Sequence, residues 1–230
     1  SFPNAERTVS VWFYANDIGV GQVPGRGLLG YGGQTCGQSW IQHISITQSP
    51  NTYEVQGHCN NEAVNVSYGP NHPNGQWHNW IISTNSAGTR FYIDGELVFA
   101  DAMFINQTNV EGKVFIFGSV VSENGNGFFF GDFNSRPLNG LLDDIAIYNR
   151  ALTATEVKAL YRSGQAKLAK SGATSVKTGL VGWWTFDGPD FTDKVYDKSG
   201  GGFNGYVVDA ATSTTKAAGR MGQAFTSDGN

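Results

Sequence analysis

The sequence predicts an all-β protein of short strands with one short helix, at about residues 153–161. Its 230 residues include 31 Gly, and while 13% of the residues are aromatic, only 15% are charged. This composition suits strands joined by turns better than it suits helices. Several segments also alternate apolar and polar residues with the period of two that a half-buried strand produces. These observations place the chain in the all-β class.

The alternation is clearest in residues 7–16 and in residues 141–148. Further strands are predicted at residues 28–31, 39–46, 52–58, 64–68, 90–93, 97–100 and 114–120. Asp94-Gly95 separates two of these strands, and this dipeptide favours the type I′ turn of a two-residue hairpin. The chain is therefore expected to run through many short strands joined by turns.

The helix is predicted from its end signals. Thr153 and Glu156 have the spacing of a capping box, in which each side chain accepts a hydrogen bond from a backbone N–H at the start of the helix. Three apolar residues then fall on one face of the helix, at Val157, Leu160 and Tyr161. Gly164 suits the left-handed residue that ends many helices. A single capped surface helix is expected.

Charge and hydropathy exclude two classes of partner. The net charge of −4 provides no basic surface for nucleic acid. No apolar run approaches the ~18 residues needed to span a membrane, so we expect no membrane insertion.

Cys36 and Cys59 are an isolated pair in a chain rich in Gly and Asn. Such a pair predicts one disulfide, and hence a secreted or cell-surface location, with two unpaired buried thiols as the alternative. Asn65 and Asn106 each begin a glycosylation sequon.

The segment LLDDIAIYNRALTATEVKALY, residues 141–161, resembles the closing signature of LamG-like jelly-roll domains in the concanavalin A-like lectin/glucanase superfamily. The matching residues are Gly140, Asp143, Asp144, Ile147, Tyr148, Asn149, Arg150, Ala151, Leu152, Glu156, Leu160 and Tyr161. Residues 7–13, the segment after Gln76 and the Asp94-Gly95 hairpin are similar to further motifs of this family. The resemblance implies a two-sheet antiparallel jelly-roll sandwich with one short peripheral helix.

The order of the motifs departs from that of the family. Motifs that normally open the domain appear after the helix instead, at residues 179–188, 197–205 and 219–229. The chain is thus expected to contain a sandwich body at 1–164, a polar linker at 165–178 and opening strands at 179–230. A sandwich without its opening strands would leave a sheet edge and part of its core uncovered.

Three arrangements remain open for residues 179–230. They complete the same domain as a circular permutation, because a 14-residue linker extends to about 45 Å. Alternatively they complete a second copy of the chain by strand donation. A head-to-tail contact that does not close into a ring builds a filament. In the third arrangement the sequence is a stretch of a tandem array of domains, cut across a repeat boundary, and these residues begin the following domain.

The resemblance implies a calcium site near the opening strand and the closing Asp-Asp, at Asp144, Asp187 and Asp197. Calcium takes six to eight oxygen ligands, which carboxylates and backbone carbonyls supply. The alternative is that these aspartates only form turns and end strands.

Aromatic residues suggest where a glycan would bind. The candidates for an exposed aromatic platform are Trp40, Tyr53, Phe128, Phe129 and Phe130. The last three are consecutive in a loop rich in Gly and Asn, which makes them difficult to bury together. The alternative is that at least one of them faces the core and the others contact a partner strand.

Catalysis is not expected. A retaining glucanase on this fold would carry carboxylates alternating along one strand, whereas Asp143 and Asp144 are adjacent and should point to opposite faces. The leading hypothesis is a non-catalytic extracellular structural or adhesive module that assembles head to tail with other copies through residues 179–230. The alternative hypothesis is a calcium-stabilised carbohydrate-binding module of a larger secreted protein.

Overall fold

The computed structural model describes residues 6–16, 26–32, 43–47, 52–56, 63–67, 75–102, 114–117, 138–165, 177–192, 194–206 and 216–228. In this part of the chain the strands are β1 (Arg7–Ala15), β2 (Arg26–Gly32), β3 (His43–Thr47), β4 (Thr52–Gln56), β5 (Ala63–Ser67), β6 (Trp77–Asn85), β7 (Gly88–Ile93), β8 (Glu96–Asp101), β9 (Val114–Phe117), β10 (Asn139–Tyr148), β11 (Leu180–Trp184), β12 (Lys194–Val195), β13 (Gly205–Tyr206), β14 (Lys216–Ala218) and β15 (Gln223–Asp228). The helix α1 spans Ala154–Gln165, and a 3-10 turn spans Gly188–Asp190. Every strand predicted in the first 150 residues has its counterpart, and the all-β class is confirmed.

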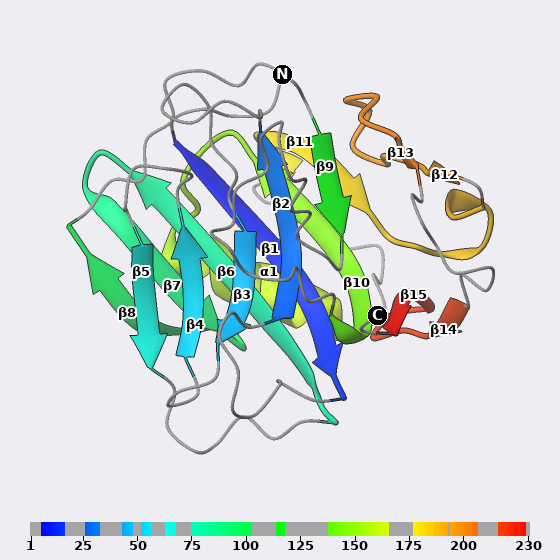
Figure 1. The fold of residues 1–230 in the computed structure, drawn as a ribbon. Helices are drawn as coiled ribbons and strands as arrows, with labels where there is room; N and C mark the ends of the chain where they lie inside the picture. The colour runs from blue at the N-terminus through cyan, green and yellow to red at the C-terminus, as the bar shows by residue number, and fades with distance from the viewer. Residues whose placement is uncertain are drawn as a thin grey trace, which may run out of the picture. The chain divides into compact units, whose positions relative to one another are not determined.

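The strands form one larger sheet, a second sheet of five strands and a small two-stranded sheet (Figure 1). The larger sheet has eight strands in the order β14-β15-β10-β1-β6-β7-β8, and β11 is also paired with β10. The second sheet has the order β5-β4-β3-β2-β9, and β12 pairs with β13 by itself. The chain divides into two compact units, one built on the larger sheet with α1 and the other on the five-stranded sheet.

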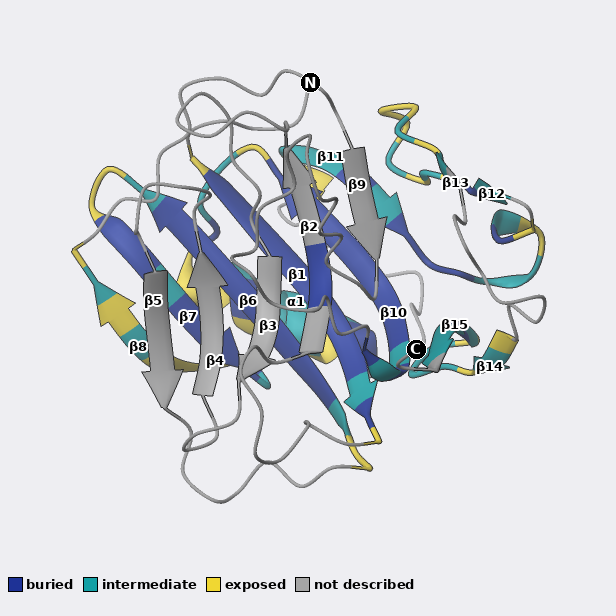
Figure 2. Cartoon of the chain, in the orientation of Figure 1, coloured by how far each residue is buried: buried dark blue, intermediate teal, exposed yellow. Residues whose placement is uncertain are grey.

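The central strands of the larger sheet are buried on both faces (Figure 2). The alternation in β1 predicts one polar, exposed face, but Thr8, Ser10 and Trp12 are as buried as the apolar residues between them. The reason is that α1 and neighbouring segments cover this face. Thr8 hydrogen-bonds to the chain that leads into α1, and the Trp12 ring stacks on the Tyr161 ring of the helix at 5.5 Å.

The same face carries an apolar cluster beneath the helix. Its buried members are Ile81, Tyr92, Ala146, Tyr148, Leu152 and Val157, with Leu160, Leu180 and Trp183 packed against them. The cluster therefore joins β6, β7, β10 and α1 to β11, which follows the linker in sequence.

The hairpin between β7 and β8 is confirmed. Ile93 pairs with Glu96 across a two-residue turn, and Asp94 and Gly95 have φ angles of 49° and 80°. A type I′ turn requires positive φ at both of these positions.

The predicted end of the helix is wrong. Gly164 was expected to follow the helix, yet α1 continues to Gln165 and Gly164 lies inside it. A Cβ at this position would meet Trp12 Cε2 at 2.8 Å. The glycine is therefore explained by the close approach of the helix backbone to the Trp12 ring rather than by a C-terminal stop.

We name residues 177–228 the completing segment, because its strands extend the larger sheet beyond β10. β11 pairs antiparallel with β10, from Ile145 opposite Trp184 to Tyr148 opposite Leu180. β15 is the other neighbour of β10, and β14 follows it at the end of the sheet. Strands from the displaced motifs at 179–188 and 219–229 thus lie beside β10 in this sheet, whereas the motif at 197–205 contributes to the separate β12–β13 pair.

Candidate functional site

An acidic cluster lies where the completing segment meets β10. We define it as Asp143 and Asp144, in the middle of β10, with Asp187, which follows β11. Asp143 is fully buried and Asp144 is 9% exposed. Adjacent residues of a regular strand point to opposite faces, but Asp144 has a φ of 42°, so the strand is irregular here and both carboxylates are buried.

Backbone and indole N–H groups hold these carboxylates. Asp143 accepts hydrogen bonds from Asp144 N at 2.8 Å and from Met221 N at 2.9 Å. Asp144 Oδ1 accepts one from Trp183 Nε1 at 3.0 Å, and Asp187 Oδ1 accepts one from the backbone N of Gln223 at 2.7 Å. Donors from the completing segment thus reach carboxylates of β10.

The three carboxylates lie close enough to perturb one another. Burial raises the pKa of Asp143, and the negative charges of Asp144 and Asp187 raise it further. Burial and the charge of Asp187 also raise the pKa of Asp144, although the hydrogen bond from Trp183 acts in the opposite direction. Like charges in a low-dielectric interior oppose ionisation, and a bound cation would relieve that opposition.

Backbone strain is concentrated beside the cluster. Among the described residues, positive φ outside glycine occurs at Asp94, in the hairpin turn, and at Asp144 and Phe186. Phe186 has a φ of 57°, is fully buried and directly precedes Asp187. Such a conformation is uncommon for a bulky residue and persists only where the surroundings determine it. The geometry around the cluster is therefore imposed by tertiary structure.

Asp197 accepts hydrogen bonds from three backbone N–H groups of the completing segment. Its Oδ1 accepts hydrogen bonds from Trp183 N at 3.0 Å and Ser199 N at 2.8 Å, and its Oδ2 accepts one from Phe203 N at 3.0 Å. Burial alone would raise the pKa of Asp197, but hydrogen bonding by the Ser199 side chain and by these backbone N–H groups outweighs burial, and the pKa is lowered. In this structure Asp197 organises the loop before β13.

The acidic cluster fits an oxygen-ligated cation better than Asp197 does. Asp144 and Asp187 each use one oxygen for a described N–H donor, and a carboxylate offers about four lone-pair sites. Within the described ranges, no group of three or more His, Cys, Asp or Glu side chains is placed so that it could by itself hold a metal ion. Asp144 and Asp187 would therefore be only part of a calcium shell, and further oxygens would have to complete it.

Several predicted residues lie outside the described part of the chain. They are Cys36, Cys59, Trp40, Phe128, Phe129, Phe130 and Asn106. Tyr53 lies on β4 opposite Val66, and Asn65 lies on β5 opposite Glu54, where the strand backbones alone are described. The disulfide, the aromatic platform and the sequons stay predictions.

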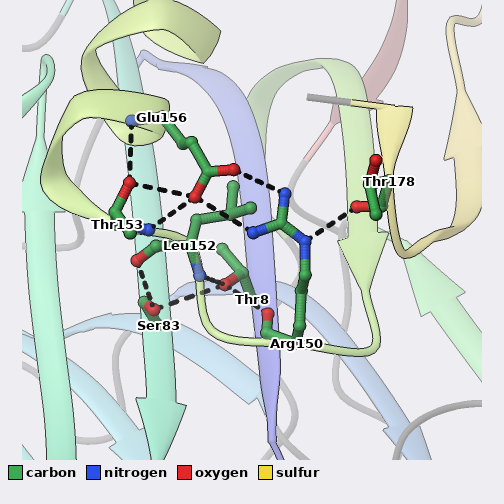
Figure 3. A network of polar contacts seen from close by, with 7 residues as sticks. All are labelled: Thr8, Ser83, Arg150, Leu152, Thr153, Glu156 and Thr178. Carbon is green, nitrogen blue, oxygen red and sulfur yellow. Dashed lines mark hydrogen bonds and ion pairs between the residues drawn. The ribbon is translucent and has the colours of Figure 1, made fainter. Parts of the chain in front are cut away.

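A second polar network joins the body to the start of the completing segment (Figure 3). Arg150 binds both oxygens of Glu156, with Nη1 to Oε2 at 3.0 Å and Nη2 to Oε1 at 2.7 Å. Its Nε donates to the carbonyl of Thr178 at 2.9 Å. The predicted capping box is present, since Glu156 Oε2 accepts from Thr153 N at 2.9 Å and Glu156 N donates to Thr153 Oγ1 at 3.3 Å.

Sequence reasoning identified Asp144, Asp187 and the capping box but missed two partnerships. It did not anticipate that the Trp183 indole would bind Asp144, 39 positions away. It also did not anticipate that Arg150 would bind the chain near Thr178. Arg150 precedes a capping-box Glu, which is a signal for the ion pair, whereas neither long-range contact has a local signal.

A family model described as the concanavalin A-like lectin/glucanases superfamily matches residues 1–158. The chain belongs to this superfamily. Its closing motif and hairpin accordingly occupy the places that the resemblance implied. A comparison with curated protein sequences found no match.

Solved structures show the same lectin-like β-sandwich fold. A protein from Bacteroides ovatus ATCC 8483, provisionally described as carbohydrate-binding, superposes with a TM-score of 0.57 at 16% identity, covering 90% of this chain and 54% of that one. A heptameric SAP-like pentraxin from Limulus polyphemus gives a TM-score of 0.51 at 18% identity, covering 70% of this chain and 71% of that one. This superfamily member thus spans about half the length of the Bacteroides protein. None of the helices in the described ranges is long and apolar enough to cross a membrane.

Proposed function

We propose that this chain is a non-catalytic carbohydrate-binding module of a secreted or cell-surface protein, stabilised by calcium. Membership of the lectin/glucanase superfamily over residues 1–158 carries the proposal. The likeness to the Bacteroides ovatus protein, itself described provisionally as carbohydrate-binding, supports it. The candidate glycan contacts are the aromatic residues named from the sequence, beginning with Trp40, Tyr53 and Phe128–Phe130.

The calcium part of this proposal rests on the acidic cluster. Asp144 and Asp187 would hold the ion, and its charge would favour ionisation of the neighbouring Asp143, whose pKa burial raises. When bound, calcium would neutralise carboxylates that repel one another across the junction between β10 and the completing segment. The ion is thus given a structural role, and Asp197 is retained as the weakest of the three predicted ligands because its oxygens accept three N–H donors.

A glycan array probed with the labelled full chain tests carbohydrate binding. We expect binding to a restricted group of glycans in the presence of calcium, with loss or weakening when a chelator is added. The matched control is Asp144→Asn, which should weaken the calcium dependence while leaving the candidate aromatic platform in place. Binding to no glycan under either condition would contradict the carbohydrate-binding proposal.

A second function, head-to-tail assembly as a structural or adhesive module, is favoured by a different observation. β10 has β1 on one side. On its other side it pairs with β11 and β15, which both come from the completing segment. The body and the segment are therefore complementary, and a linker allows a segment to complete either its own body or that of a second copy.

The mass of the native protein in solution tests this second function. Light scattering across a range of concentrations should show species larger than the 24.8 kDa monomer, and electron microscopy should show arrays or fibres. A monodisperse monomer at every concentration would contradict assembly and leave the carbohydrate-binding proposal intact.

A further inference from the structure

The end of β10 contacts the first residues of the completing segment at two adjacent positions. Asn149 N donates to the carbonyl of Gly179 at 2.8 Å, and Arg150 Nε donates to the carbonyl of Thr178 at 2.9 Å. We call Asn149 and Arg150 the docking corner. Pairing between β10 and β11 begins directly afterwards with Tyr148 opposite Leu180. The register shifts by one residue between this pair and the next, Ile147 opposite Gly182, so the corner lies at the irregular end of the pairing, where β11 begins.

The corner accepts glycine and disfavours any larger residue. Gly179 has a φ of 78°, a conformation that is unfavourable for a residue with a Cβ. A Cβ there would also lie 2.7 Å from Asn149 Oδ1 and 3.1 Å from Arg150 Cγ. Both the backbone conformation and the available space therefore select glycine at this position.

The corner is also bonded to the start of α1. The guanidinium that binds Thr178 holds the Glu156 carboxylate at two points, and this hydrogen bonding lowers the pKa of Glu156 to about 2. Glu156 in turn accepts hydrogen bonds from the backbone N and the hydroxyl of Thr153, each at 2.9 Å. One side chain, Arg150, therefore joins the helix N-terminus to the completing segment.

The backbone at the corner is hydrogen-bonded to β1, and the backbone two residues later is hydrogen-bonded to β1 and β6 of the larger sheet. Thr8 Oγ1 donates to the Arg150 carbonyl at 2.9 Å and accepts from Leu152 N at 2.9 Å. Ser83 Oγ donates to the Leu152 carbonyl at 3.1 Å. These buried bonds from β1 and β6 hold the Arg150 backbone, so its guanidinium extends from a defined position (Figure 3).

We propose that the docking corner is a glycine-selective docking point that anchors the start of the completing segment and couples its docking to the N-terminus of α1. The partner is the segment of the same chain in which a Thr178-Gly179 turn directly precedes the strand β11. This inference rests on the proposed complementation of body and segment, and it adds the residues that recognise the segment.

A double-mutant cycle tests the coupling. Gly179→Ala places a Cβ against the corner, whereas Glu156→Gln removes the ion pair to Arg150 but keeps a residue that suits a capping box. We expect the two changes to be non-additive. The fold-change in the unfolding equilibrium constant of the double variant should be about fivefold smaller than the product of the two single-variant fold-changes. Each variant is measured by urea unfolding of the full chain at low concentration.

Gly200→Ala provides the matched control. Gly200 has a φ of 88°, but its Cβ position has no neighbour within 4 Å, so the substitution adds backbone strain without touching the corner. Its cycle with Glu156→Gln should be additive, and its single effect should be smaller than that of Gly179→Ala. Additive behaviour in both cycles would overturn the coupling.

Hydrogen exchange gives a second readout that does not depend on complete unfolding. In Gly179→Ala, the amide of Val157, which donates to the Thr153 carbonyl at 2.9 Å, should exchange faster than in Gly200→Ala. Equal exchange rates would overturn the proposal. Both readouts apply whether the segment is bound within a chain or between chains, so failure of head-to-tail assembly leaves them interpretable.

Discussion

A chain that ends after Gln165 should fail to form a stable domain. It retains the body of the larger sheet but loses β11, β14 and β15, which leaves β10 as a bare edge strand. The fully buried residues Phe186 and Ala224 and the nearly fully buried Trp184 go with the deleted part. Losing one buried Trp side chain costs about 3–5 kcal/mol, against a typical total stability of about 5–15 kcal/mol.

The deletion also removes donors from buried acids. Asp143 would lose the Met221 amide and Asp144 would lose the Trp183 indole. An unsatisfied buried polar group costs about 1–3 kcal/mol, and more if it is charged. We therefore expect loss of cooperative thermal unfolding, or aggregation, measured by circular dichroism and size exclusion.

The control for the deletion is a full chain cleaved at an engineered protease site in the linker. It contains the same residues in two pieces, and it should keep most of its cooperative unfolding if contacts across the junction hold the pieces together. A chain ending at Gln165 that melts cooperatively within a few degrees of the full chain would contradict the requirement for the completing segment.

Without calcium, the protein should lose stability as the pH rises from about 4 to about 8. The folded-state pKa values of Asp143, about 8, and Asp144, about 7, lie above the ordinary value of 3.8, because burial and neighbouring carboxylates disfavour ionisation. Groups with raised folded-state pKa values contribute full stability below the unfolded pKa and lose it as the pH passes the folded pKa. Calcium should restore stability at the upper end of this range.

Asp144→Asn should be more stable than the native chain at pH about 8 in the presence of a chelator, by about 2 kcal/mol. The amide oxygen can still accept the Trp183 indole N–H, and Asn tolerates the positive φ of this residue better than most. The same variant should gain less from calcium. The measurement is chemical unfolding at pH 5 and at pH 8, with and without calcium.

Asp197→Asn is the contrasting variant. An amide cannot accept all three N–H donors that Asp197 holds, so this variant should be less stable at both pH values and keep its response to calcium. If Asp197→Asn abolished the calcium response while Asp144→Asn preserved it, the assignment of the ion to the acidic cluster would be wrong.

Local patterns predicted the elements but not how they are joined. The Asp94-Gly95 turn and the Thr153–Glu156 box depend on neighbours within four positions, and both occur as predicted. The end of the helix was wrongly predicted at Gly164 because this glycine is explained by its contact with Trp12, which lies far away in sequence on β1. The burial of Thr8 likewise follows from contacts with Arg150 and Leu152, more than 140 positions away.

The candidate site was predicted in composition but not in arrangement. Aspartates at positions 144 and 187 were named, yet the sequence does not show that Asp144 departs from regular strand geometry at positive φ. β10 pairs with both β11 and β15, which are distant in sequence, and Asp143 is buried beside Asp144. The separate role of Asp197 follows from three backbone N–H groups that a sequence pattern does not position.

The most direct test of the account is a set of nuclear Overhauser contacts between β10 and β11. In uniformly labelled protein, backbone protons of Ala146 and Trp183, and of Ile147 and Gly182, should show cross-strand contacts. A mixture of labelled and unlabelled chains, recorded with isotope filtering, then shows whether the contacts lie within one chain or between two. Cross-strand contacts in the uniformly labelled sample are predicted; their absence, with residues 180–184 giving no contact to β10, would contradict the account.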